Sequence, residues 1–213
     1  MRSYVIHLIR HGLTEANRKG MYIGRTDLPL IPEGEKQLES MRKNEKYPSV
    51  QAVYSSPLVR CVRSAEILFP NREIITIPEF TEYDFGDFEG KTGEELDGRP
   101  DYIGWTSGKM PAPNGEANED FVKRLCIGLN NVVRQMMENG QTSAAVMMHG
   151  GAIMMLLAAC GLPRHRSVDW MCSAGEGYSI RITPSIYQRT GAVEVFDTVP
   201  AAQTFSDEED YED

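Results

Sequence analysis

The sequence predicts an α/β fold, a three-layer α/β/α sandwich with a mostly parallel central sheet and an antiparallel edge strand. Two patterns lead to this prediction. Short apolar runs alternate along the chain with segments whose apolar residues recur at helical spacing, and this alternation is typical of parallel sheets with helices on both faces. The last two apolar runs, 177–183 and 192–196, are predicted to pair antiparallel.

The first half of the chain contains three predicted strands and two predicted helices. They are strand 4–9, a helix from residue 32 or 33 to 44, strand 52–55, helix 57–68 and strand 73–77. The apolar run at 4–9 is interrupted only by His7, as expected for a strand that is covered on both faces. Pro32 suits the first position of a helix, because a backbone N–H is not needed there.

The second half begins with an excursion over 85–115 that is rich in glycine, proline and aspartate and is predicted to hold two short helices. The elements after it are helix 116–138, strand 143–148 and helix 152–160. Between residues 144 and 162 only His149 is strongly polar, so a hydropathy scan would read a membrane span here. Gly150-Gly151 in its middle instead favours a buried strand, a turn and a buried helix.

Composition favours a single domain over residues 1–205, followed by an acidic and disordered tail at 206–213. The chain has 213 residues, of which 41% are hydrophobic and 25% are charged, as in ordinary globular proteins. The net charge is −9, but six acidic residues lie among the last seven, so the rest of the chain is only mildly acidic. A nucleic-acid partner, which requires a basic surface, is not expected.

The same kind of reasoning predicts a cytoplasmic protein without a membrane, metal or cofactor partner. The N-terminal apolar run is too short for a signal peptide and ends at Arg10. The four cysteines are widely spaced and form no CxxC pair, so free thiols are expected. His7 and His11 are four residues apart, which is a zinc-binding spacing only on a helix. The sequence contains neither a P-loop motif nor a dinucleotide-binding glycine motif.

Candidate catalytic residues follow the predicted strands at their carboxyl ends, where ligands bind in open parallel sheets. His11 and His149 both fall at the ends of predicted strands. Arg60 lies one helical turn past another strand, and Glu82 follows a fourth. A histidine held at such a position suits nucleophilic attack, and the guanidinium of Arg10 beside it matches the oxygens of a phosphate or carboxylate. Each residue alone could instead have a structural role, as a core histidine or a surface ion pair.

Four segments, taken together and in order, resemble the histidine phosphatase superfamily, which has the phosphoglycerate-mutase-like fold. They are Arg10-His11-Gly12, Ser55-Ser56-Pro57-Leu58-Val59-Arg60, Glu82 shortly before Phe85-Gly86-Asp87-Phe88-Glu89-Gly90, and Met148-His149-Gly150. The resemblance covers the chain from about residue 4 to about residue 197. The third segment is similar to the phosphatase branch that includes the α-ribazole phosphatases.

The resemblance implies a mechanism with a phosphohistidine intermediate. His11 would attack phosphorus as a neutral imidazole, which is the main form near pH 7 at the ordinary pKa of ~6.5. The charge on the phosphoryl oxygens would be stabilised by Arg10, Arg60 and His149. Glu82, the one acid of its acidic stretch that matches the family, would protonate the leaving oxygen and then activate water. That role requires a raised pKa.

The resemblance also implies contacts to the phosphate group. Asn17 matches an asparagine that hydrogen-bonds the phosphate, and residues 22–30 match a loop over it that contains Gly24, with Thr26 as the contact. The backbone N–H of Gly150 is a further donor. Arg25 can reach either the substrate or the solvent, and the sequence does not decide between the two.

The expected activity is hydrolysis of a small phosphorylated metabolite. Two alternatives stay open, a cofactor-dependent phosphoglycerate mutase and a catalytically inactive binding protein of the same fold. The mutase is disfavoured because the charges of the 85–115 excursion are mostly acidic and would repel a second anionic group. The aromatic residues Phe88, Tyr102 and Trp105 of this excursion could stack on a substrate ring or form a small core of their own. The resemblance also allows a homodimer.

Overall fold

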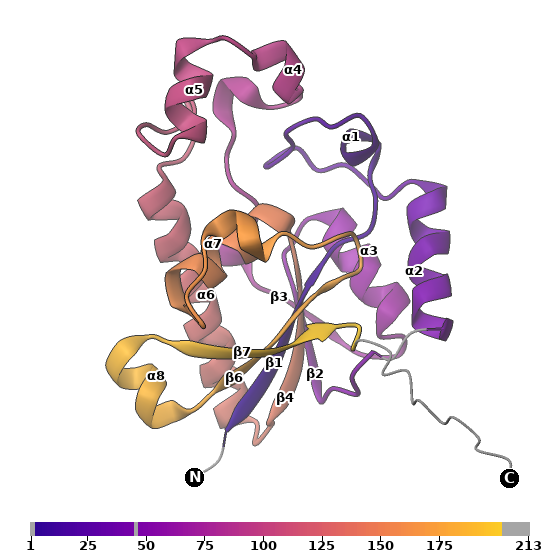
Figure 1. The fold of residues 1–213 in the computed structure, drawn as a ribbon. Helices are drawn as coiled ribbons and strands as arrows, with labels where there is room; N and C mark the ends of the chain where they lie inside the picture. The colour runs from indigo at the N-terminus through magenta and orange to yellow at the C-terminus, as the bar shows by residue number, and fades with distance from the viewer. Residues whose placement is uncertain (1–2, 45–46, 202–213) are drawn as a thin grey trace, which may run out of the picture.

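The computed structural model describes residues 3–44 and 47–201 and confirms the predicted α/β fold (Figure 1). Its strands are β1 (Tyr4–Arg10), β2 (Ala52–Ser55), β3 (Ile74–Thr76), β4 (Ser143–Met148), β5 (Gly161–Leu162), β6 (Gly177–Ile182) and β7 (Val193–Val199). Its α-helices are α1 (Glu15–Arg18), α2 (Pro32–Asn44), α3 (Val59–Leu68), α4 (Gly93–Leu96), α5 (Pro100–Thr106), α6 (Asn118–Glu138), α7 (Gly150–Cys160) and α8 (Pro184–Thr190). The predicted tail at 206–213 lies outside the described residues, and the single-domain boundary at residue 205 stays a prediction.

The sheet has the strand order β3-β2-β4-β1-β6-β7-β5 and is mostly parallel. β1 pairs parallel with β4, and β2 pairs parallel with both β3 and β4. β6 runs antiparallel to its two neighbours, β1 and β7. One detail of the prediction needs correction, since the antiparallel strand lies inside the sheet and not at its edge. β7 and the two-residue β5 extend the sheet beyond it, and so short an edge strand has no sequence periodicity to reveal it.

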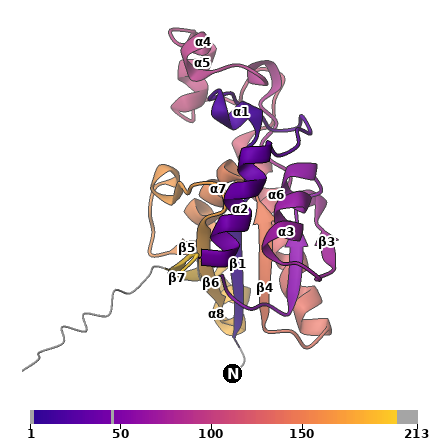
Figure 2. The same cartoon turned by 90° about the vertical axis from the view of Figure 1, so that its right-hand side faces the viewer.

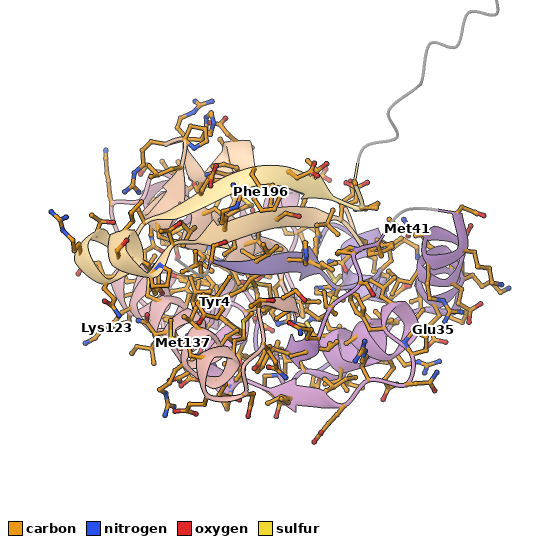
Figure 3. All side chains as sticks on the ribbon, turned by 90° about the horizontal axis from the view of Figure 1, so that it is seen from below. Tyr4, Glu35, Met41, Lys123, Met137 and Phe196 are labelled. Atoms are coloured by element: carbon orange, nitrogen blue, oxygen red, sulfur yellow. The ribbon has the colours of Figure 1, made fainter. Side chains whose placement is uncertain are left out.

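Helices cover both faces of the sheet. Successive side chains of a strand point to opposite faces, and the strands carry apolar residues on both. Ile6 and Leu8 of β1 belong to a large hydrophobic cluster that includes residues of α6 and α7, whereas Ile9 belongs to a smaller cluster with residues of α2 and α3. Seen from below, Met137 of α6 and Met41 of α2 lie on opposite sides of the molecule (Figure 3). The strand pattern therefore builds the three layers.

Most element boundaries agree with the sequence, and the exceptions have local causes. Strands β2 and β4 have the predicted bounds, but α7 begins at Gly150, two residues earlier than predicted, with His149 as its N-terminal cap residue. Helix α8 was not predicted. Its signals were present, because Pro184 occupies the first turn and Gly191 follows the last turn with φ of 68°.

The 85–115 excursion carries α4 and α5, and together with α1 it lies above the carboxyl ends of the parallel strands (Figures 1 and 2). Strand β1 begins with Tyr4 at the opposite end of the sheet. Residues 144–162 form β4, α7 and β5, and in the described part of the chain no helix is long and apolar enough to cross a membrane. The excursion is therefore placed to cover whatever binds at the strand ends.

Candidate active site

A cavity of about 420 Å³ opens where β1 and β4 end, a volume suited to a small ligand. Five predicted site residues line this cavity: Arg10, His11, Asn17, Glu82 and Gly150. The other four are joined to one another behind its surface, because Arg60 hydrogen-bonds His149, Gly24 and Thr26. The structure thus brings all nine predicted residues into one region, in two groups.

The imidazole of His11 is buried and held in one orientation by its own turn. Nδ1 lies 2.6 Å from the carbonyl oxygen of Gly12. Because a carbonyl can only accept a hydrogen bond, Nδ1 carries the proton. Burial, followed by the charges of Arg60 and Arg10, lowers the pKa of His11 to about 3. The ring is therefore neutral near pH 7, with the lone pair on Nε2, the atom that remains for attack on a substrate.

Arg10 lies between the loop after α7 and the start of that helix. Its Nη1 donates to the carbonyl of Cys172 at 2.7 Å, while its buried Nε has no hydrogen-bond partner. A Cβ on Gly150 would lie 3.3 Å from the guanidinium carbon, so the glycine permits this close approach. Arg10 can therefore donate further hydrogen bonds to an anion in the cavity.

Arg60 is a fully buried cation, with 1% of its surface exposed. Nη1 donates to the carbonyl of Thr26 at 2.9 Å, and Nη2 donates to that of Gly24 at 2.8 Å. Among the described residues, neither Arg60 nor Arg10 forms an ion pair with a carboxylate. An unneutralised buried charge is costly. The uncompensated positive charge of Arg60 therefore favours the binding of an anion close by.

His149 supports this arrangement from the end of β4. Its ring lies edge-on to that of His11, with 5.2 Å between centroids. Nδ1 accepts from Nε of Arg60 at 3.3 Å, so Nε2 carries the proton and donates to Oγ of Ser56 at 2.8 Å. Burial and the neighbouring His11 and Arg60 lower the pKa of His149 well below its ordinary value. The ring orients Arg60 in this structure, and its contact with a phosphoryl oxygen stays a prediction.

The carboxyl group of Glu82 is buried against the first turn of α7. Its two oxygens accept from the backbone N–H groups of Tyr83 and Gly151, each at 2.9 Å. A Cβ at Gly151 would lie 2.8 Å from Oε1 of Glu82, so only glycine fits there without a shift. Burial raises the pKa of Glu82 and outweighs these hydrogen bonds, which lower it. A raised pKa is what a carboxyl group needs in order to act as a general acid.

The loop that holds Gly24 and Thr26 is fixed by Glu89. Its carboxylate accepts from the N–H of Gly24 at 3.0 Å and from that of Thr26 at 2.9 Å. A Cβ at Gly24 would lie 1.7 Å from the carbonyl oxygen of Tyr83, which excludes any other residue in this conformation. The loop is thereby tied to the segment that carries Glu82. The predicted phosphate contacts of Gly24 and Thr26 stay predictions.

Asn17 lines the cavity from α1, where it has a structural role as well. Its Oδ1 accepts from the N–H and the hydroxyl of Thr14 at 3.1 and 2.9 Å, which closes a capping box. The amino group of Asn17 is then the part that can donate to a ligand. Gly150 offers a second donor, because the first N–H groups of a helix have no partner within the helix.

The thiols and the possible metal ligands of the described residues can be examined directly, and metal independence stays a prediction. The four cysteines are free: Cys61, Cys126, Cys160 and Cys172. Within residues 3–44 and 47–201, no three His, Cys, Asp or Glu side chains come together in a way that could hold a metal ion.

Comparison with known proteins identifies the family. The model of the histidine phosphatase superfamily (branch 1) matches residues 6–186. The chain belongs to this superfamily. An uncharacterized phosphatase of Bacillus subtilis strain 168, PhoE, is 36% identical over 153 residues, which cover 70% of this chain and 74% of PhoE. The adenosylcobalamin/α-ribazole phosphatase of Escherichia coli K12 is 29% identical over 177 residues, which cover 78% of this chain and 85% of that protein.

A solved phosphoglycerate mutase of Bacillus anthracis strain Sterne has the same fold, with a TM-score of 0.72 and 92% of each chain covered. At 18% identity this likeness concerns the fold alone. The predicted superfamily and its α/β fold are therefore confirmed. Because phosphatases and a mutase share the fold, only the site can distinguish between them.

Sequence reasoning missed Arg124, the residue that fixes the position of Glu82 in this histidine phosphatase. Its guanidinium donates to the backbone carbonyls of Glu79, Thr81 and Glu82 and to both carboxylate oxygens of Glu116. All five N–H donors of the side chain are thus used. One sequence signal could have revealed it, because an arginine three residues after Phe121 on the buried face of a helix needs a partner.

Replacing Arg124 should destabilise the fold more than replacing an exposed arginine of the same helix. Arg124→Ala leaves the half-buried Glu116 carboxylate and three carbonyls without their donor, so we expect a loss of about 2–3 kcal/mol in the free energy of unfolding. Arg134→Ala is the control, since Arg134 is 64% exposed and lies 3.8 Å from Glu138; it should cost less than about 0.5 kcal/mol. Urea unfolding measures both, and equal losses would contradict the positioning role.

Proposed function

We propose that this protein hydrolyses small phosphate monoesters through a phosphohistidine formed on Nε2 of His11. One observation carries the proposal. A neutral imidazole with its lone pair on Nε2 lies beside two arginines that have no carboxylate partners among the described residues. Such a cluster attracts the phosphoryl group and does not repel it from the nucleophile.

The reaction has two steps. First, the Nε2 lone pair of His11 attacks phosphorus while the ester P–O bond breaks, and Glu82 donates its proton to the departing oxygen. Second, water attacks the phosphohistidine, the P–N bond breaks, and the Glu82 carboxylate accepts a proton from that water. Inorganic phosphate leaves, and both residues return to their starting states. Arg10 and Arg60 stabilise the negative charge of the phosphoryl oxygens in both steps.

A phosphoglycerate mutase is the second candidate, because the family fold also serves that reaction. A mutase must bind the carboxylate of its sugar acid in addition to the phosphate. Of the described residues that line the cavity, Arg10 is the only arginine or lysine, and it lies at the His11 end. The cavity therefore favours hydrolysis.

We also propose a cytoplasmic location for the protein. The four free cysteines accord with it, because reducing compartments preserve thiols.

Replacing the nucleophile should abolish turnover. For His11→Ala we expect a loss of roughly a thousandfold or more in kcat, measured with p-nitrophenyl phosphate. Wild-type protein quenched in alkali during turnover of a radiolabelled ester should carry an acid-labile phosphoryl group that the variant lacks. His165→Ala, at an exposed histidine, is the control and should keep full activity. Substantial activity in His11→Ala would exclude the covalent route, and inactive wild type would favour a binding protein.

Replacing the general acid should affect poor leaving groups most. For Glu82→Gln we expect a loss of roughly a hundredfold or more on alkyl phosphates. The loss on p-nitrophenyl phosphate should be much smaller, because nitrophenolate leaves without a proton. An equal loss on both substrates would assign proton donation to another group.

The pH dependence of kcat/KM should report the titration of Glu82. Glu82 donates its proton only below its pKa, so kcat/KM of the wild type on alkyl phosphates should fall as pH rises through that raised value. This fall should be absent in Glu82→Gln. His11, with a pKa of about 3, should limit activity only in strong acid. A fall with rising pH that persists in Glu82→Gln would contradict this assignment.

Chelation should leave activity unchanged, because the guanidinium groups of Arg10 and Arg60 supply the positive charge that a metal would bring. The measurement is turnover after exhaustive treatment with EDTA. Vanadate, which adopts the trigonal-bipyramidal geometry of the transition state, should inhibit strongly. A loss of activity that a divalent cation restores would overturn this prediction.

A further inference from the structure

We infer that the natural substrate is the phosphate ester of an uncharged, ring-bearing alcohol. This inference rests on the proposed function and names its substrate class. The part of the cavity away from His11 would hold the alcohol, and its walls decide which alcohol fits. These walls are aromatic and thioether side chains, and they offer no charged partner.

Aromatic rings form one wall of the cavity. Tyr22, Phe85 and Trp105 all line it and contact one another, with ring centroids 5.2 to 5.8 Å apart. Tyr83 and Phe121 continue this wall toward Glu82, at 5.3 Å from each other. Rings held in this way offer flat surfaces on which another ring can stack or meet edge-on.

The hydroxyl groups of the two tyrosines that line the cavity already form hydrogen bonds within the protein. The hydroxyl of Tyr22 shares a hydrogen bond of 2.7 Å with that of Tyr102. The hydroxyl of Tyr83 donates to the carbonyl of Glu116. These partners hold both hydroxyl groups within the protein, and both side chains line the cavity. Trp105 of the 85–115 excursion packs against other aromatic rings and also lines the cavity. For this residue, a role in a small aromatic core and a role in stacking on a substrate ring are therefore compatible.

Methionines form another part of the cavity lining. Met21, Met154, Met155 and Met171 line the cavity, and Met171 at its mouth is 65% exposed. Thioether side chains are flexible and make favourable contacts with aromatic rings. They would adapt to rings of different shape.

Charged groups are confined to the phosphate end. Of the described residues that line the cavity, Arg10, His11 and Glu82 are the only arginine, lysine, histidine, aspartate or glutamate residues. Asn118 adds an uncharged polar contact. A second carboxylate or phosphate on the substrate would lie against apolar walls without a counter-charge, which is costly.

The test compares three esters of primary alcohols, so that the leaving oxygen changes little. They are ethyl phosphate, benzyl phosphate and 4-carboxybenzyl phosphate. We expect kcat/KM for benzyl phosphate to exceed that for ethyl phosphate by roughly tenfold or more, the discrimination typical of an apolar pocket. The added carboxylate should lower it again by roughly tenfold. Equal values for ethyl and benzyl phosphate, or for the two benzyl esters, would overturn the inference while the phosphatase stands. Failure to hydrolyse any monoester, p-nitrophenyl phosphate included, would overturn both.

Variants of the wall provide the second part of the test. Trp105→Ala should reduce the preference for benzyl over ethyl phosphate at least about threefold, and Trp105→Phe should keep most of it. Ile103→Ala, in the same helix at a position that is 56% exposed and outside the cavity, should leave the preference unchanged. A preference that Trp105→Ala leaves intact would contradict ring binding at this wall.

A variant at the mouth tests the missing counter-charge without disturbing the core. Met171→Lys places a cation at a position that is already largely exposed. It should raise kcat/KM for 4-carboxybenzyl phosphate relative to benzyl phosphate by roughly threefold or more. An unchanged ratio would show that charge at the mouth does not govern selection, and would contradict the inference.

Discussion

The parallel pairing of β1 with β4 is the constraint on which the site depends. In this register Arg10 lies opposite Met148, and the N–H of His11 donates to the carbonyl of Met148 at 3.0 Å. The next residues along both strands are therefore the two histidines, with rings 5.2 Å apart. The same register places the start of α7 beside Arg10 and Glu82. A one-residue slip would turn each side chain to the other face of the sheet.

Burial then sets the chemistry of these groups. It keeps both imidazoles neutral, raises the pKa of Glu82, and leaves Arg10 and Arg60 without ion-pair partners among the described residues. A phosphate dianion in the cavity would offset the uncompensated charges of Arg10 and Arg60 and would favour the protonated form of Glu82. The fold bears this cost because rigid strand ends and close glycine contacts hold the groups in place.

Sequence reasoning identified the parts of the site that follow from local patterns. Strand ends, the Arg-His-Gly turn and the order of the motifs were enough to place His11, Glu82 and His149 in one region. Contacts between side chains and backbone groups far apart in the sequence could not be predicted in this way. The position of Arg124 on the buried face of its helix indicates that this side chain needs a partner, but it does not say which one. The carbonyl contacts of Arg124 and the loop amides held by Glu89 depend on segments that only the tertiary structure brings together.

The central claim is that phosphorus is attacked twice, first by His11 and then by water. The stereochemistry at phosphorus tests this most directly, using a phosphorothioate monoester made chiral with oxygen isotopes and hydrolysed in labelled water. Each in-line displacement inverts the configuration, so two displacements predict overall retention. Overall inversion would mean that water attacks the substrate directly, and it would contradict the phosphohistidine route.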